Sequence, residues 1–414
     1  MKVGSNNTAK KRPDSRSRFY RISAWLHLWL GLVAGIIFVI VCLTGCIWVF
    51  NEEITTMLEP ETRVAVQHNR PVITPSRIME VVDKEFPGKI PGGVTFREGK
   101  TVEVYVGERR GGSILKLNPY TGEVVKKEIR KEGQTGFFRW ILNGHRFLWL
   151  PYKIGRPIIN YSTLVCVITL LTGLALWWPK RWNKNTRNQS FKIKWGASFK
   201  RVNYDLHNVL GFYALLILLA IGLTGMVWGI EWFSKGLYWT TSGGRTLPEY
   251  VEAKSDTTQA GKHTYTLAAA MDKAWQEVTT KHPQASGFYL TFPVKKRPEA
   301  AIAIYVYPSK GRFFDSQGYM FDQYTLSPVK ANKLYEQSYQ EAAFGDRLRK
   351  MNYDIHVGSI LGLPGKFLAF FASLIGASLP ITGAIVYFGK KKKKKKPPVV
   401  KATKAVKAEK ILQH

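Results

Sequence analysis

The stretch WLHLWLGLVAGIIFVIVCLTGCIWVF, residues 25–50, decides the fold class of this chain. It belongs to a longer run, residues 22–50, that contains no Asp, Glu, Lys or Arg. About 20 apolar residues suffice to cross a bilayer as a helix. Three more charge-free runs follow along the chain, at residues 157–179, 206–230 and 367–389. The sequence therefore predicts a membrane protein with four transmembrane helices.

The letters LTGC at residues 43–46 resemble the cleavage site of a bacterial lipoprotein signal. The apolar core of a secretory signal is roughly 7–15 residues long, which is shorter than this run. In addition, LTG recurs at residues 223–225, where Met226 follows and no lipid can be attached. We therefore interpret LTG as part of the helices and residues 22–50 as a permanent span.

The basic residues predict the orientation of the helices. They gather in the N-terminal segment 1–21, in the loop 180–205 and in the lysine-rich tail 390–414, which together carry most of the net charge of +32. Basic segments stay in the cytoplasm. We therefore expect both termini and the loop 180–205 in the cytoplasm, and the two long loops, 51–156 and 231–366, on the other side.

An isoelectric point near 10.0 would also suit a protein that binds nucleic acid. The lysine run at residues 390–396 is instead explained as a determinant of topology that touches anionic lipid head groups. We predict the lipid bilayer as a partner and no binding of nucleic acid.

The spans repeat in pairs. When His27 is aligned with His207, HLWLG lies over HNVLG, and LTG begins 16 residues after the histidine in both. The second and fourth spans carry LTG at 171–173 and ITG at 381–383, and NYDLH at 203–207 is echoed by NYDIH at 352–356. Repeats of this kind predict two copies of one structural unit.

The long loops repeat as well. In the first, TPSRIMEVVDKEFPG is typical of a capped amphipathic helix, and TVEVYV and SILKLNPYTGEVVKK follow as strand candidates. In the second, TLAAAMDKAWQEVTTKHP precedes GFYLTFPV, AAIAIYVYP and GYMFDQYTLSPV. One helix packed on a small antiparallel sheet, twice, predicts two compact α+β modules.

Modules that end in D/N-x-Y-T, set between spans with H-x-x-x-G and TG, resemble the PepSY-associated transmembrane family over about residues 20–390. That family includes inner-membrane iron-uptake proteins and siderophore-iron reductases with two b-type haems. The resemblance implies four transmembrane helices, two extracytoplasmic PepSY-like modules, two haem b groups and a place in the bacterial inner membrane. Some relatives are fused to a flavin reductase domain. We find no such segment here and expect a separate cytoplasmic electron donor.

Four of the eight histidines, His27, His145, His207 and His356, stand at or before the start of a span. A single interfacial histidine beside tryptophans is more often an anchor at the membrane surface. Repetition in four helices favours a functional role, and neutral imidazole is a ligand for iron, copper and zinc. His27 and His207 share the cytoplasmic level, and His145 and His356 the opposite one. Two ligands at each level predict two bis-histidine haems, with these four residues as the axial ligands of the iron.

Asp or Asn precedes three of these histidines by two residues, and both are good N-caps. This predicts His145, His207 and His356 in the first turn of a helix. Because Pro151 and Gly155 separate His145 from its span, and GLPGK follows His356, we expect the outer pair on short interfacial helices.

Other residues are expected near the haems. Gly31 and Gly211 lie one turn from their histidines, where they suit either a flat macrocycle or close helix packing. By their depth, the TG threonines of the second and fourth spans approach the cytoplasmic pair, and those of the first and third approach the outer pair. Three arginines near the outer histidines are candidates for haem propionates or for solvated surface charge: Arg146, Arg347 and Arg349.

These features favour an enzyme, a haem-dependent oxidoreductase that carries electrons across the membrane and reduces an external ferric siderophore or other ferric chelate. The iron-specific part follows from the resemblance alone. One alternative is a non-enzymatic protein whose tethered modules bind or regulate a partner outside. Another is a transporter, although the spans contain no Asp or Glu.

Overall fold

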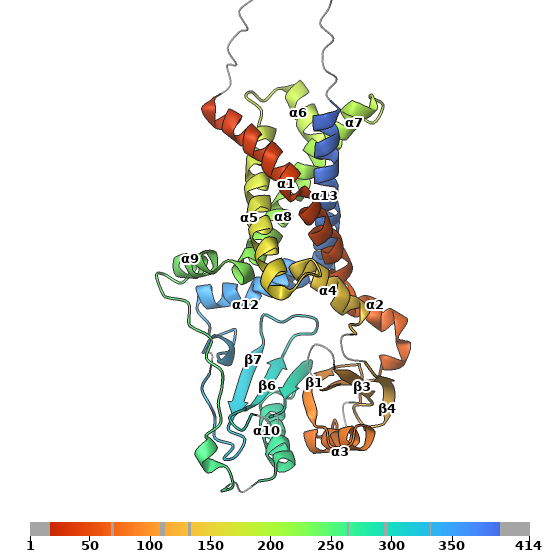
Figure 1. Ribbon diagram of the computed structural model, residues 1–414, viewed down its shortest axis with the longest axis vertical. Helices are drawn as coiled ribbons and strands as arrows, with labels where there is room; N and C mark the ends of the chain where they lie inside the picture. Colours follow the sequence, from red (N-terminus) through yellow and green to blue (C-terminus); the bar gives the residue numbers. More distant parts are fainter. Residues whose placement is uncertain are drawn as a thin grey trace, which may run out of the picture.

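The structure is a computed structural model that describes residues 17–389, apart from 68–69, 108–111, 131–133, 263–264, 294–296 and 332. The N-terminal basic residues 1–16 and the lysine-rich tail 390–414, which the topology prediction used, lie outside the described residues. A bundle of long helices forms one half of the molecule and a β-sheet with its own helices forms the other (Figure 1). We call the two ends of the bundle the sheet end and the α6 end.

Within the described part of the chain, four helices are long and apolar enough to cross a membrane, as the charge-free runs predicted. They are α1 (Arg18–Val49), α5 (Tyr152–Trp177), the continuous segment Phe199–Gly229 and α13 (Leu363–Phe388). The third consists of α7 (Phe199–Asp205), a π-helical turn (Leu206–Leu210) and α8 (Gly211–Gly229). Each helix begins a few residues before its charge-free run, because charged residues at a helix end can reach the membrane surface.

Shorter helices surround the ends of the bundle (Figure 1). At the α6 end lies α6 itself (Lys184–Phe191). At the sheet end lie α2 (Asn51–Leu58), α4 (Phe137–Phe147), α9 (Glu231–Thr241) and α12 (Phe344–Val357). His145 lies on α4 and His356 on α12, so the prediction of short helices separate from the spans is confirmed. Single turns occur at Pro60–Thr62, Thr257–Gln259, Lys333–Glu336 and Ser359–Leu361.

The two long loops share one antiparallel sheet of seven strands, in the order β4-β3-β2-β1-β5-β6-β7. The first loop supplies β1 (Pro91–Arg97), β2 (Val102–Val106), β3 (Ser113–Leu117) and β4 (Val124–Glu128). The second supplies β5 (Gly287–Thr291), β6 (Ile302–Tyr307) and β7 (Gln317–Phe321). The prediction of two compact modules is therefore corrected to one joint unit.

Strand β1, which the sequence did not predict, joins the strands of the first loop to those of the second. It pairs with β5, placing Thr95 opposite Tyr289. Its glycines weaken the strand signal but are needed at the seam, since a Cβ on Gly93 would stand 2.8 Å from the hydroxyl of Tyr289.

One face of the sheet carries the core. The helices α3 (Pro75–Glu85) and α10 (Leu267–Lys281) cover it on the side away from the bundle (Figure 1). The predicted cap of α3 is confirmed, since the side chain of Thr74 accepts a backbone N–H, and Thr266 caps α10 in the same way. Alternate strand residues such as Val94, Val104 and Ile304 are completely buried against these helices. The opposite face of the first strands, with Lys116 among its residues, is turned toward the sheet end of the bundle.

Candidate functional site

The four histidines singled out in the sequence lie as two facing pairs. The ring centroids of His27 and His207 are 6.1 Å apart with an angle of 78° between the planes. Those of His145 and His356 are also 6.1 Å apart, at 70°. Two imidazoles on one metal ion, each bonded at about 2 Å, have centroids about 6 Å apart. The spacing therefore suits two ligands on opposite sides of one ion.

Each ring has its Nδ1 nitrogen against a backbone carbonyl of another helix. A carbonyl oxygen only accepts, so Nδ1 carries the proton and the lone pair of Nε2 is left for a metal. The Nδ1–O distances are 2.9 Å for His27 to Thr169, 2.9 Å for His145 to Val41, 3.1 Å for His207 to Leu379 and 3.0 Å for His356 to Ile221.

Each accepting carbonyl lies three residues before the threonine of a TG pair. The threonine hydroxyls also approach Nδ1, at 3.5 Å for Thr172 and His27 and at 3.0 Å for Thr382 and His207. Thr44 and Thr224 lie at 3.3 and 3.0 Å from the outer rings. The prediction from depth is confirmed: the TG pairs of the second and fourth spans approach the cytoplasmic histidines, and those of the first and third approach the outer ones. The carbonyl acceptors were missed, although a fixed step of three residues before TG marks them.

The TG glycines leave room for the rings. A Cβ on Gly173 would stand 3.0 Å from Cε1 of His27, and one on Gly383 would stand 3.1 Å from Cε1 of His207. The corresponding distances are 3.3 Å at Gly45 and 3.5 Å at Gly225. A side chain at Gly173, Gly383 or Gly45 would press on the imidazole, whereas one at Gly225 would reach ordinary contact with its ring. The carbonyl, the threonine and the glycine together form a socket for each ring.

Gly31 and Gly211 have a different environment. A Cβ at Gly31 would lie 3.6 Å from a methyl carbon of Thr169, and one at Gly211 would lie 3.5 Å from Leu379. These are ordinary packing distances to a neighbouring helix. Both glycines therefore lie at contacts between helices, as close helix packing requires.

We expect Gly173→Ala to disturb the pair of His27 and His207, whereas Gly31→Ala should have little effect. The added methyl group at Gly173 meets the imidazole, and overpacking of this kind costs about 1–3 kcal/mol. The haem content and absorbance bands of the two purified variants measure the difference. Wild-type bands in Gly173→Ala would show that the socket does not need this glycine.

The repeated NYD-x-H motif fastens the histidine helices to their surroundings. The side-chain amides of Asn203 and Asn352 donate to the backbone oxygens of Thr382 and Thr224, at 3.0 and 3.2 Å. The motif therefore links each histidine helix to the TG pair that holds its histidine.

The predicted role of the aspartates as N-caps is wrong. Asp205 accepts from the backbone N–H of Lys194 at 3.2 Å, and Asp354 from the backbone N–H of Phe313 at 3.1 Å, so both tie a neighbouring segment to the helix. His145 and His356 stand in the last turn of α4 and α12. His207 stands in the π-helical turn, a local widening that often marks functional sites.

The sheet-end pair is buried in a form suited to ligation. Burial lowers the pKa of His145 and His356, and that of His356 falls to about 3, with the charge of His145 as the next cause. Both rings are therefore neutral, as metal binding requires. Within the described ranges, His, Cys, Asp and Glu form no group of three or more. Two protein ligands suit an iron already held by a macrocycle better than zinc, which takes three or four protein ligands.

The two pairs lie far apart along the bundle. The socket for His145 is formed by α1 around residues 41–45, and His27 lies 14 to 18 residues earlier on the same helix. At 1.5 Å per residue this is about 21–27 Å. A hydrocarbon core is about 30 Å thick, so the pairs stand near its opposite boundaries.

Two of the three arginines expected near the outer pair have other partners. Arg347 donates to the backbone oxygens of Tyr339 and Gln340. Arg349 donates to the hydroxyl of Ser234 at 3.0 Å. Both guanidinium groups thus donate to oxygen atoms of other residues, and none of these contacts places Arg347 beside the histidines.

The model of one protein family, described as PepSY-associated TM region, matches residues 24–390. This range includes all four paired histidines, the TG sockets and the whole sheet. No curated protein matches the chain.

Proposed function

The chain belongs to the PepSY-associated transmembrane family, and from this premise we propose that it is a transmembrane electron carrier with two bis-histidine b-type haems that reduces an external ferric chelate of the siderophore type. The observation that carries the proposal is the pairing of the four imidazoles with Nε2 left for a metal. When bound, haem supplies an iron that exchanges one electron at a time, at a potential set by its ligands and burial.

The residues of the chain have distinct tasks in this proposal. His27 and His207 would hold one haem, and His145 and His356 the other. The carbonyl sockets fix the tautomer of each ring and make it a better donor to the metal. The lowered pKa of the sheet-end pair, caused first by burial, keeps both rings neutral. The chain thereby provides two one-electron sites near opposite surfaces of the membrane.

We also propose that the chain is two copies of one unit joined at the histidine pairs. In the first half, the TG at 172–173 holds His27 and the TG at 44–45 holds His145. In the second half, the TG at 382–383 holds His207 and the TG at 224–225 holds His356. Each pair takes one imidazole from each half, so neither half could supply both axial ligands.

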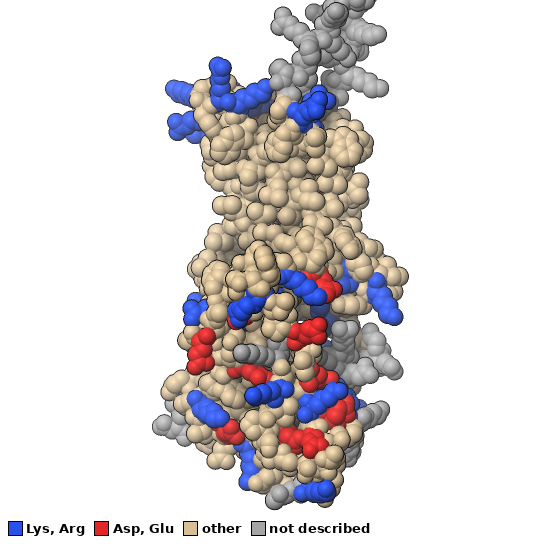
Figure 2. Space-filling model, turned by 90° about the vertical axis from the view of Figure 1, so that its left-hand side faces the viewer, with Lys and Arg blue, Asp and Glu red and all other residues tan. Residues whose placement is uncertain are grey.

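The α6 end suits a cytoplasmic electron donor. Residues 180–201 contain eight Lys or Arg and no Asp or Glu. On the face shown in Figure 2, the charged side chains visible at this end are Lys and Arg, whereas the sheet carries both signs. Asp205, which pairs with Arg201, is completely buried. A patch of one sign attracts an acidic partner over long range. We infer an acidic electron-donor protein that docks here.

The same charge distribution predicts that the α6 end is cytoplasmic and the sheet extracytoplasmic, in the inner membrane of a bacterium. A reporter fused after Arg187 should therefore indicate the cytoplasm, and one fused after Lys330 the outside. A cytoplasmic signal from the fusion after Lys330 would reverse the orientation and with it the direction of electron flow.

The absorbance spectrum of the purified protein tests the proposal. We expect the bands of low-spin haem, two haems per chain, and haem that solvent extraction removes, because no CxxCH motif for covalent attachment is present. After chemical reduction in sealed vesicles, an impermeant ferric chelate on the sheet side should reoxidise the protein with one Fe(II) formed per electron. A spectrum without haem would contradict the proposal and favour a non-enzymatic binding role for the sheet.

A further inference from the structure

Two arginines bind the end of α8 that lies beside the sheet-end histidine pair. Arg156, near the start of α5, donates to the backbone oxygen of Trp228 at 3.0 Å. Arg349, on α12, donates to the backbone oxygen of Val227 at 3.5 Å. Carbonyls in the last turn of a helix have no partner within the helix, so they are open to such donors. The ring of Trp228 lies 5.1 Å from that of His356, so both guanidinium groups bind next to the pair.

Both arginines are also close to the socket of His356. A Cβ on Gly225, the glycine of this socket, would stand 3.6 Å from a methyl carbon of Thr163, which lies two turns after Arg156 on α5. Arg349 lies two turns before His356 on α12. Two turns of helix correspond to about 10 Å. Each arginine is therefore about 10 Å along its own helix from the level of the socket.

A third arginine, Arg146, follows His145 directly on α4. Burial lowers the pKa of His145 most, and the charges of Arg146 and Arg156 lower it further. All three arginines are half-buried, and among the described residues no carboxylate forms an ion pair with any of them. Their positive charge is thus not cancelled locally.

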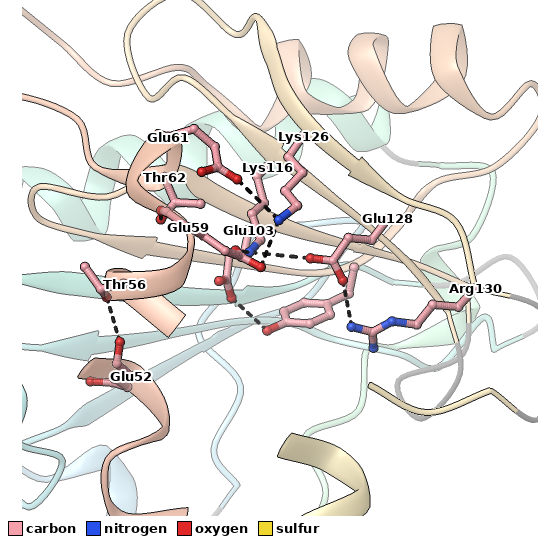
Figure 3. A network of polar contacts seen from close by, with 11 residues as sticks. Glu52, Thr56, Glu59, Glu61, Thr62, Glu103, Lys116, Lys126, Glu128 and Arg130 are labelled. Atoms are coloured by element: carbon pink, nitrogen blue, oxygen red, sulfur yellow. Dashed lines mark hydrogen bonds and ion pairs between the residues drawn. The ribbon is translucent and has the colours of Figure 1, made fainter. Parts of the chain in front are cut away.

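Other cations at this end of the bundle and on the sheet are neutralised by carboxylates. Lys366, on α13, forms an ion pair with Glu53 at 2.6 Å. Lys116, which is only 4% exposed, is bound by Glu59 in a network that also holds Lys126, Glu61, Glu128 and Arg130 (Figure 3). The three arginines beside the histidines differ from these cations in having no such partner.

Two negative features near the sheet-end pair offset part of this charge. Asp354 lies two residues before His356 and accepts from the backbone N–H of Phe313 and from the hydroxyl of Ser359. The C-terminus of α8 adds the equivalent of about half a negative charge. Three guanidinium groups exceed these two features together, so the pair has a net positive environment.

The cations of the α6 end are arranged differently. Arg201 forms an ion pair with Asp205 at 2.9 Å. Every other Lys or Arg between residues 180 and 200 is exposed. Salt largely screens exposed charges beyond about 10 Å, whereas partly buried charges are screened much less. The pair of His27 and His207 therefore has less unscreened positive charge around it than the sheet-end pair.

We propose that Arg146, Arg156 and Arg349 raise the reduction potential of the sheet-end one-electron site above that of the α6-end site. A nearby positive charge stabilises the reduced iron, which carries one positive charge less than the oxidised iron. One electron then passes from the α6-end iron, which is oxidised from Fe(II) to Fe(III), to the sheet-end iron, which is reduced from Fe(III) to Fe(II). The inference rests on the proposed function and adds the driving force for its direction.

Redox titration of the purified full-length protein, followed by the haem bands, tests the inference. The one-haem variants His145→Ala and His27→Ala assign the two midpoint potentials, and we expect the sheet-end midpoint to be the higher. Arg156→Gln keeps a donor for the oxygen of Trp228 but removes the charge. This variant should lower the sheet-end midpoint alone and shift the equilibrium of the electron between the sites about tenfold, which is about 59 mV for one electron. Arg156→Lys should restore the wild-type value.

Asn160→Ala is the matched control. The side-chain amide of Asn160 donates to the backbone oxygen of Gly229 at 2.7 Å, so it binds the same end of α8 from the same helix without a charge. This variant should leave both midpoints unchanged. If Arg156→Gln loses haem, Arg349→Gln removes another of the three charges and gives the same comparison.

Three outcomes would overturn the inference. They are a sheet-end midpoint equal to or below the other one, a sheet-end midpoint that the glutamine variants leave unchanged, and an equal fall in Asn160→Ala, which would show an effect of packing and not of charge. In each case two haems per chain would leave the proposed function intact. A protein without haem would contradict the proposed function, and the inference with it.

Discussion

His27→Ala or His207→Ala is expected to lower the haem content from two per chain to one, and His145→Ala or His356→Ala to remove the other haem. Each facing pair takes its two imidazoles from different helices, 6.1 Å apart at the centroids. Removal of one ring leaves a single protein ligand on that iron and an empty socket on one side. The haem content of the purified variants, with the bands that remain, gives the result.

His282→Ala is the matched control. His282 follows α10 and interacts with the hydroxyl of Tyr319 at 2.6 Å, on the sheet and away from both pairs. This variant should keep two haems. Two haems in every single variant of the four histidines would show that the pairing is wrong. If a variant loses both haems, His27→Gly with imidazole added during assembly distinguishes ligand loss from misfolding, because free imidazole can fill the socket.

His145→Ala is expected to reduce the rate of external ferric chelate reduction to the background rate, while the haem held by His27 and His207 can still be reduced. The sheet-end pair lies on α4 and α12, at the end of the bundle that faces the sheet, whereas the other pair lies about 21–27 Å farther along α1. Without the sheet-end site, electrons from the α6 end have no carrier for the second part of this distance.

The measurement uses sealed vesicles with the sheet outward, electrons supplied at the α6 end and an impermeant ferric chelate outside. Formation of Fe(II) and the haem bands are followed together. His282→Ala should reduce the chelate at the wild-type rate. Continued chelate reduction by His145→Ala would place the exit site elsewhere, and reduction only from the α6 side would reverse the proposed direction.

The joint sheet has a consequence for the sheet-end pair. His145 is carried by α4, the helix that follows β4, and His356 by α12, which follows β7 after one short helical turn. Pairing of β1 with β5 links these two loops into one unit with a shared core. The sheet therefore restricts how far the two helices can separate, which suits a site whose ligands come from different halves of the chain.

Much of the membrane part could be predicted from the sequence alone. Charge-free runs indicated the four long helices, because a helix in lipid needs a continuous apolar surface. Spacing along these helices also predicted which TG pairs approach the cytoplasmic histidines and which approach the outer ones, since a straight helix converts residue numbers into depth. The positions of His27 and His207 at one level, and of His145 and His356 at the other, followed from the same conversion.

Only the tertiary structure decided the features that depend on contacts between distant segments. The pairing of β1 with β5 joins strands almost 200 residues apart, and the glycines in β1 obscured its local pattern. The aspartates of NYD-x-H were interpreted as caps because capping is their commonest local role, whereas here they accept from the backbone of neighbouring segments. The carbonyls that hold the histidines belong to other helices and come into position only where those helices pack together. Secondary-structure propensity depends on consecutive residues, whereas a contact between distant segments is determined only when the chain packs.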